Sequence, residues 1–318
     1  MELYKETELT VSFFLLLSQE FQYICLVILS FVANTVKNYL SLVKFSHTIF
    51  AMPFAVIGFM LGVSQPGQKF DGFLFVLVIL CMVFARTAAM AFNRWADRNY
   101  DIENERTKVR EIPSGVISSR AAALLVIGSS IAFIATTWFI NSLCFALSPI
   151  ALLVVLGYSF TKRFTWLCHL VLGIGLSLAP IGAYLAVTGE FAWLPILFSM
   201  TVLTWVTGFD IIYALQDEEF DKSLELYSMP SIFGKKKALN TSSFFHLMSI
   251  VFLIIAGTLA GYGFTYWAGV TIFTSLLIYQ HTLVKPHDLS KVNIAFFTTN
   301  GIASIVFAAF VVTELIIS

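Results

Sequence analysis

Two clusters of carboxylates have the spacing of a metal site built on helix ends. Asn93, Asp97 and Asp101 recur at intervals of four residues, and Asp217 and Asp221 are also four apart. Residues four apart share one face of an α-helix. Carboxylates held one turn apart repel each other unless a cation lies between them. Oxygen-only ligands suit Mg²⁺, which usually takes one or two carboxylates together with phosphate oxygens. The spacing therefore predicts a magnesium–phosphate site.

Asp210 and Tyr213 precede the second cluster. If the helix continues, Asp210 shares a stripe with Asp217 and Asp221, with Tyr213 beside it. A single Asp-x-x-x-Asp pair is more often a solvated helix face. An acidic residue within an apolar segment is expensive to bury and usually functional. Two matched pairs, one following such a residue, favour the functional interpretation.

Residues suited to bind phosphate lie in and after the first cluster and in a separate short segment. Arg94 lies within the first, Arg110 follows it, and Tyr158, Lys162 and Arg163 occupy a separate short segment. Arginine offers a bidentate fork to phosphate oxygens, and lysine offers a compact point charge. We expect these residues to bind a diphosphate, the alternative being that the basic loops only orient the chain in a membrane.

These motifs lie between long apolar segments. The 318 residues are 58% hydrophobic and 12% charged, whereas a soluble domain carries about 25% charged residues. A helix needs about 20 mostly apolar residues to cross a bilayer. The chain has such segments near 45–64, 70–92, 119–140, 142–160, 165–187, 191–214, 240–261, 264–283 and 294–316. The sequence therefore predicts an all-α integral membrane bundle of about nine transmembrane helices.

The basic residues predict the orientation of the bundle. Fourteen of the 19 Lys and Arg residues fall in loops after even-numbered spans, and one, Lys69, falls in the other loops. Basic loops stay in the cytoplasm. Both carboxylate clusters end even-numbered spans, so we expect them to face the cytoplasm, in a bacterial inner membrane.

The N-terminal part stands outside this pattern. Residues 11–33 are apolar but interrupted by polar side chains, which favours an interfacial helix over a further span. The acidic start argues against a signal peptide. We expect residues 1–40 to form an extension and residues 41–318 the main domain.

Other classes of protein fit less well. None of the four cysteines forms a C-x-x-C pair, so no zinc site or disulfide framework is indicated. No basic cluster has the interleaved aromatic residues of a nucleic-acid binder. An ion-coupled transporter remains the alternative, since intramembrane acids also mark carriers. It predicts acids at mid-bilayer, whereas these acids gather at one interface beside phosphate-binding cations, which favours an enzyme.

The motifs resemble those of the UbiA superfamily of intramembrane aromatic prenyltransferases. The N-R-x-x-D-x-x-x-D stretch with the following R-T-x-x-R-x-x-P-x-G, residues 93–115, is similar to the first family signature. Residues 158–165 and 210–234 are similar to the second and third. The Lys44, His47 and Phe50 stretch is also similar. The detail of residues 110–115 and 213–217 looks most like the branch that prenylates hydroxyaromatic acids in quinone synthesis.

This resemblance implies a central cavity under cytoplasmic cap loops, with Mg²⁺ as cofactor. It implies transfer from a polyprenyl diphosphate to an aromatic acid such as 4-hydroxybenzoate, in ubiquinone or menaquinone biosynthesis. Alternative acceptors are a dihydroxynaphthoate, haem, chlorophyllide and a glycerol phosphate. His47 is a polar core residue or an acceptor contact; no protein partner is implied. The expected metal ligands are Asn93, Asp97, Asp101, Asp217 and Asp221, and Asp210 and Tyr213 are expected to flank the reacting cation.

Overall fold

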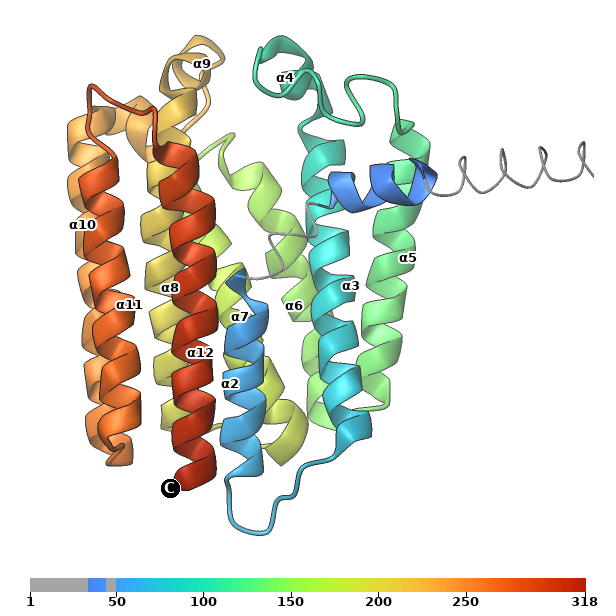
Figure 1. Ribbon diagram of the computed structural model, residues 1–318. Coiled ribbons are helices and arrows are strands. Elements are labelled where there is room, and N and C mark those ends of the chain that lie inside the picture. Colours follow the sequence, from blue (N-terminus) through green and yellow to red (C-terminus); the bar gives the residue numbers. More distant parts are fainter. Residues whose placement is uncertain (1–33, 44–49) are drawn as a thin grey trace, which may run out of the picture.

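The computed structural model describes residues 34–43 and 50–318. The expectations for residues 11–33, Lys44 and His47 lie outside these ranges. Residues 34–42 form a helix that lies across α3 (Gly72–Ala96) in Figure 1, and Leu42 belongs to the same hydrophobic cluster as Ala91. The boundary predicted at residue 40 stays a prediction.

The described residues form a bundle of helices without a β-strand (Figure 1). In order they are α2 (Met52–Val63), α3 (Gly72–Ala96), α4 (Arg98–Glu103), α5 (Ser119–Trp138), α6 (Ser142–Thr161), α7 (Cys168–Thr188), α8 (Trp193–Ala214), the 3₁₀ turn η2 (Leu215–Asp217), α9 (Glu218–Ser223), α10 (Met229–Ala260), α11 (Phe264–Leu283), the π-helical η3 (Ile294–Thr299) and α12 (Asn300–Ile317).

Seven of these helices are long and apolar enough to cross a membrane: α3, α5, α6, α7, α8, α10 and α12. The shorter α2 and the more polar α11 occupy the two remaining predicted positions. Within the described residues the helices thus follow the predicted nine-span order, and the prediction of an all-α membrane bundle is confirmed.

Polar caps determine where several helices begin. Asp71 accepts hydrogen bonds from the amides of Phe73 and Leu74, and Asn141 accepts one from Cys144. Such caps satisfy N–H groups that the first helical turn leaves unpaired.

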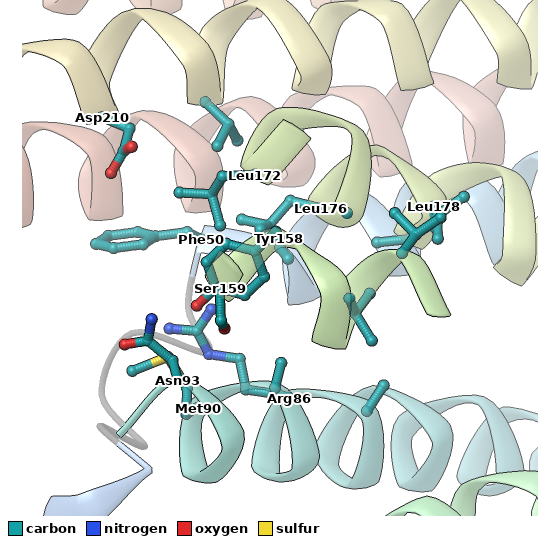
Figure 2. A pocket seen from close by; sticks show the side chains of 18 of the residues that line it. Phe50, Arg86, Met90, Asn93, Tyr158, Ser159, Leu172, Leu176, Leu178 and Asp210 are labelled. Atoms are coloured by element: carbon teal, nitrogen blue, oxygen red, sulfur yellow. The ribbon is translucent and has the colours of Figure 1, made fainter. Parts of the chain in front are cut away.

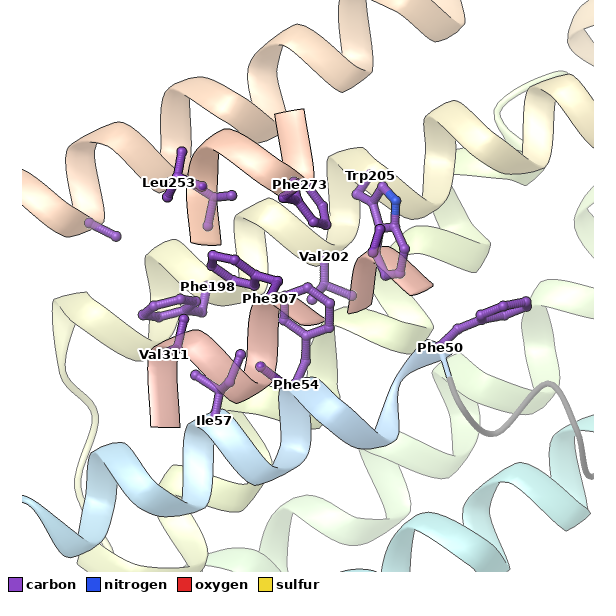
Figure 3. Close-up of a cluster of buried hydrophobic side chains, with 14 of the residues drawn as sticks. Phe50, Phe54, Ile57, Phe198, Val202, Trp205, Leu253, Phe273, Phe307 and Val311 are labelled. Carbon is purple, nitrogen blue, oxygen red and sulfur yellow. The ribbon is translucent and has the colours of Figure 1, made fainter. Parts of the chain in front are cut away.

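Aromatic side chains build the core on one side of the bundle. Phe54 of α2, Trp205 of α8, Phe273 of α11 and Phe307 of α12 are fully buried or nearly so and gather in one cluster (Figure 3). The Trp205 indole donates to the Asn300 amide oxygen at 3.0 Å. In the most apolar stretch of the α8 segment 67% of residues are buried, against 17% in α3. Therefore α8 is the central helix, while α3 belongs to a thinner wall.

Three helix ends differ from the continuous helices expected from sequence. Helix α3 ends at Ala96 and α4 begins at Arg98, with Asp97 between them. The stripe after Asp210 is interrupted by the 3₁₀ turn η2. Helix α10 begins at Met229, well before the expected 240, and bends at Gly234, which has a φ of 78°. That left-handed backbone favours glycine because it has no Cβ.

Candidate active site

The carboxylate clusters lie at the mouth of a large cavity. Its volume is about 1060 Å³, and its wall includes Asp97 and Asp217 at the end of the bundle where α3 and α8 finish, here called the motif end. From there the cavity follows α3, α6 and α7 to Ile140 and Leu185 at the opposite end of the bundle. The site is therefore polar at its mouth and apolar along its length.

The first cluster keeps its helical spacing through the break after α3. The Asp97 amide donates to the Asn93 carbonyl at 2.9 Å, and the Asp101 amide donates to the Asp97 carbonyl at 2.8 Å. The Asn93 side-chain amide also donates to the Asp97 carboxylate at 2.9 Å. Arg163 donates to the Ala96 carbonyl at 2.8 Å and to Asp97 at 3.3 Å. The predicted alignment of the cluster is thus present.

Arg94 and Arg110 lie beside Asp101. The Arg110 guanidinium donates to one Asp101 oxygen at 2.6 Å, while the other Asp101 oxygen is buried without a hydrogen-bond partner among the described residues. Arg94 is 4% exposed and lines the cavity, and its Nε likewise lacks a partner there. Buried polar atoms without partners are costly, so both groups are suited to bind a ligand.

The loop after the first cluster binds the second cluster. Arg106 donates through Nε to Asp217 at 3.1 Å and through Nη1 to the Tyr213 hydroxyl at 3.0 Å. The Asn104 side chain donates to Asp217 at 3.4 Å. These contacts join segments more than a hundred residues apart and bring the two clusters to one cavity, as the matched spacing predicted.

Asp221 has a different environment from the other carboxylates. Its side chain is fully buried, lies 2.7 Å from the Lys162 ammonium and accepts a hydrogen bond from Ser228 at 2.8 Å. Burial alone lowers the pKa of Lys162, but the neighbouring Asp221 carboxylate outweighs it, so that the pKa of Lys162 is raised. Asp221 does not line the cavity, whereas Lys162 does. The structure therefore holds Asp221 behind the site.

Asp210 is bound to a histidine that the sequence analysis did not single out. His169 Nδ1 lies 2.7 Å from an Asp210 oxygen, and the Met229 amide donates to His169 Nε2 at 3.2 Å. Because Nε2 accepts, Nδ1 carries the hydrogen and donates to Asp210. Both side chains line the cavity. In a sequence, a lone histidine in an apolar helix is weak evidence for a functional site. Only the pairing with Asp210 in the structure indicates that His169 belongs to the site.

Ion pairs balance the carboxylates at the motif end. Asp97, Asp101, Asp217 and Asp221 each contact one Arg or Lys side chain. Burial raises the pKa of Asp97, although the hydrogen bond from Arg163 opposes this effect. Neighbouring basic and acidic side chains complement a ligand that carries both signs of charge, such as a metal-bound diphosphate. The basic side chains suit the phosphate oxygens, and the carboxylates suit the metal ion.

The donor set fits Mg²⁺ as a partner of a phosphate ligand. No group of three or more His, Cys, Asp and Glu side chains that could hold a metal ion occurs among the described residues. Mg²⁺ needs only one or two carboxylates when phosphate oxygens and waters complete its shell. Asp97 and Asp217, with side chains 28% and 12% exposed, supply such carboxylates at the cavity mouth.

Arg86 is a second residue lining the cavity that the sequence analysis did not single out. It lies on α3 about two turns from Asn93 and lines the cavity. Figure 2 shows its guanidinium beside Tyr158 and Ser159. Its Nε has no hydrogen-bond partner, and no ion pair is formed by Arg86 within the described part of the chain. The available signal was a charged residue inside an apolar span, which usually marks function.

The UbiA prenyltransferase family profile matches residues 51–302. The chain belongs to the UbiA prenyltransferase family. Its motifs had indicated this family, and the match confirms that the protein is a prenyltransferase and an integral membrane protein.

Among its relatives are two bacterial enzymes named 4-hydroxybenzoate octaprenyltransferase. The protein of Nitrosospira multiformis is 31% identical over 242 residues, which cover 76% of this chain and 83% of the relative. The protein of Aliivibrio fischeri strain ES114 is 32% identical over 254 residues, which cover 77% and 86% respectively.

Solved UbiA structures have the same fold. A UbiA homologue from Aeropyrum pernix K1 has a TM-score of 0.76 and 30% identity, covering 84% of this chain and 98% of its own. A homologue from Archaeoglobus fulgidus, solved with DMAPP and Mg²⁺, has a TM-score of 0.67 and 22% identity, covering 88% of this chain and all of its own. That second likeness shows the fold alone.

Proposed function

We propose that this UbiA-family enzyme transfers a polyprenyl group from a polyprenyl diphosphate to a hydroxyaromatic acid of the 4-hydroxybenzoate type, with Mg²⁺ as cofactor. The relatives named above support this acceptor. The observation that carries it is Arg86, a cationic side chain inside the cavity without an anionic partner among the described residues.

A carboxylate on the acceptor would compensate the charge of Arg86. A charged group within a membrane helix is costly unless it is paired, and a guanidinium binds a carboxylate through two parallel hydrogen bonds. Arg86 lies about 10 Å along α3 from Asn93. That separation leaves room for a benzene ring between the acid and the diphosphate site.

The residues of the motif end are proposed to bind the diphosphate. Asn93, Asp97 and Asp217 hold it through Mg²⁺, which neutralises charge on the departing diphosphate when bound. The basic residues Arg94, Arg106, Arg110, Lys162 and Arg163 bind its oxygens directly. Preorganised charges of this kind favour a transition state in which negative charge develops.

Breaking the bond between the allylic carbon and the diphosphate leaves an allylic cation. The ring carbon ortho to the acceptor hydroxyl attacks this cation, and loss of the ring proton restores aromaticity. Tyr213 stands on the cavity wall with its ring stacked on Phe296, the centroids being 4.2 Å apart. Aromatic faces and the nearby Asp210 carboxylate can stabilise the passing cation.

Acceptor selection tests this proposal. Purified enzyme with Mg²⁺ and a labelled prenyl diphosphate should prenylate 4-hydroxybenzoate in preference to its uncharged amide. Arg86→Leu is expected to lower kcat/KM for the acid by about 10²-fold, because the acid loses its charged hydrogen-bond partner. For the amide, the same variant should have the same kcat/KM as the parent enzyme.

Arg120→Leu is the matched control, since Arg120 is exposed at the start of α5. It should leave kcat/KM unchanged. A dihydroxynaphthoate belongs in the panel because it also carries a carboxylate. Equal turnover of acid and amide by the parent enzyme would contradict the assignment of Arg86.

We further propose that the motif end faces the cytoplasm of a bacterial inner membrane. The support is the concentration of basic residues in the loops at this end. Cysteines at the exposed positions Ser118 and Ser223 should react with reagents that reach the cytoplasm. Cysteines at Gln68 and Glu190, exposed at the opposite end, should react from outside.

The parent protein gives the background reaction of its own cysteines. Labelling of Ser118→Cys and Gln68→Cys from the same side would refute the proposed orientation.

A further inference from the structure

We propose that Asn300, a fully buried residue outside the cavity, is a positioning residue for prenyl transfer. Its side chain fixes the π-helical turn η3 so that Phe296 supports the ring of Tyr213 at the cavity wall. This role rests on the proposed function for the identity of the reaction that Tyr213 serves. The contacts that define the role are present in the protein without a substrate.

The side-chain amide of Asn300 has a partner for each of its polar atoms. Its nitrogen donates to the Phe296 carbonyl at 2.9 Å and to the Ala295 carbonyl at 3.2 Å, and its oxygen accepts from the Trp205 indole at 3.0 Å. An indole N–H can only donate, which fixes the orientation of the amide. Gln280 of α11 donates to the same Ala295 carbonyl at 3.0 Å. Side chains of α8, α11 and α12 are therefore all joined to this one turn.

Stability alone does not account for this network. Asn300, Trp205 and Gln280 are each 0% exposed, and none of them lines the cavity. Replacing buried hydrogen-bond partners by apolar groups of the same shape can be nearly neutral. The core around them is otherwise aromatic and aliphatic. A π-helical turn is also rare and is often found at a functional site, so we looked for what this turn presents to the cavity.

The turn places two aromatic side chains on the cavity wall. The consecutive residues Phe296 and Phe297 both line the cavity, with ring centroids 4.8 Å apart. The ring of Phe296 is stacked on Tyr213, with an angle of 29° between the planes. The guanidinium of Arg106, which also binds Asp217, lies 5.3 Å from the centroid of the Tyr213 ring. Tyr213 is thus fixed between η3 and the loop at the motif end.

The backbone of Phe296 links the buried amide to the site. Asn300 binds the carbonyl of the same residue whose ring supports Tyr213. A π-helical turn contains one residue more than an α-helical turn, so relaxation to α-helical pairing would rotate the Phe296 side chain by about 100° around the helix axis. An aromatic face stabilises a cation only at close range. Turnover should therefore depend on Asn300 although its side chain lies outside the cavity.

Asn300→Leu keeps the size and branching of the side chain but removes its hydrogen bonds. We expect kcat to fall at least about tenfold, because a small displacement of groups that face the reacting atoms is costly. The Kd of unreactive geranyl thiolodiphosphate should stay within about threefold of the parent value, since the carboxylates at the motif end keep their own ion pairs.

Thr201→Val is the matched control. Thr201 is also 0% exposed, donates within α8 to the Leu197 carbonyl at 3.0 Å and does not line the cavity. Its replacement removes a buried hydrogen bond from the same core without touching η3. Both kcat and the Kd of the thiolodiphosphate should equal those of the parent enzyme.

A double variant and a spectroscopic probe distinguish positioning from a structural role. Phe296→Leu should also lower kcat, and adding Asn300→Leu should lower it by less than about twofold more, because Asn300 acts through Phe296. A fluorotyrosine placed at position 213 alone reports on the stacked ring. Its fluorine NMR resonance should shift in Asn300→Leu and stay unchanged in Thr201→Val.

A parent-like kcat or an unshifted resonance in folded Asn300→Leu would overturn the proposal, and so would losses that multiply fully in the double variant. Where Asn300→Leu does not fold, Gln280→Met decides, because it removes only the hydrogen bond to Ala295. A lower kcat together with a shifted resonance is then required. If the parent enzyme prenylates no hydroxyaromatic acid, the proposed function fails, and the fluorine resonance without substrate still tests whether Asn300 positions Tyr213.

Discussion

Replacing Asp97 or Asp217 by alanine is expected to lower kcat by more than about 10³-fold, the cost of losing a group that stabilises a developing charge. Both carboxylates line the cavity mouth, and both contact partly exposed arginines rather than the apolar core. The variants should therefore insert and fold like the parent. Single-turnover rates measure the effect on catalysis, and thermal unfolding in detergent measures the effect on folding.

Asp221→Ala provides the contrast within the same motif. Because Asp221 is fully buried and binds Lys162 and Ser228, its loss should lower the free energy of unfolding by about 1–3 kcal/mol. Asp288→Ala, at an exposed loop position, should change neither kcat nor the free energy of unfolding. Activity of Asp97→Ala or Asp217→Ala within about tenfold of the parent would exclude these carboxylates as ligands of the metal–diphosphate complex.

Removing divalent cations is expected to abolish turnover, with Mg²⁺ alone restoring it. The proposed ligands are all oxygen atoms, a set that prefers Mg²⁺ over softer metals. Turnover measured in excess EDTA and again after addition of Mg²⁺ tests this expectation. The thermal unfolding of the enzyme should respond little to EDTA, because Arg106, Arg110 and Arg163 pair with the acids directly. Full turnover in protein shown to be free of metal would exclude the magnesium requirement.

The membrane fold and the family could be predicted from residue order alone. The length of an apolar segment is a local property, and a segment long enough to cross a bilayer has helix as its main way to pair its backbone groups. The predicted span at 264–283 agrees with Phe264–Leu283, and 142–160 agrees closely with Ser142–Thr161. Motif spacing is local as well, so the Asn93, Asp97 and Asp101 alignment survived the break at Asp97.

The roles of individual side chains depended on packing between distant helices. Spacing made Asp217 and Asp221 equivalent, but only Asp217 lines the cavity. Asp217 ends the 3₁₀ turn η2, whereas Asp221 lies in α9 and is buried against Lys162 and Ser228. Arg106 binds Asp217 across a separation that no periodicity describes. In the sequence, Arg86 is only a charged residue within an apolar span. The structure shows that it lies beside Tyr158 of α6. Local rules state which residues share a helix face, whereas the side-chain environment depends on which faces meet.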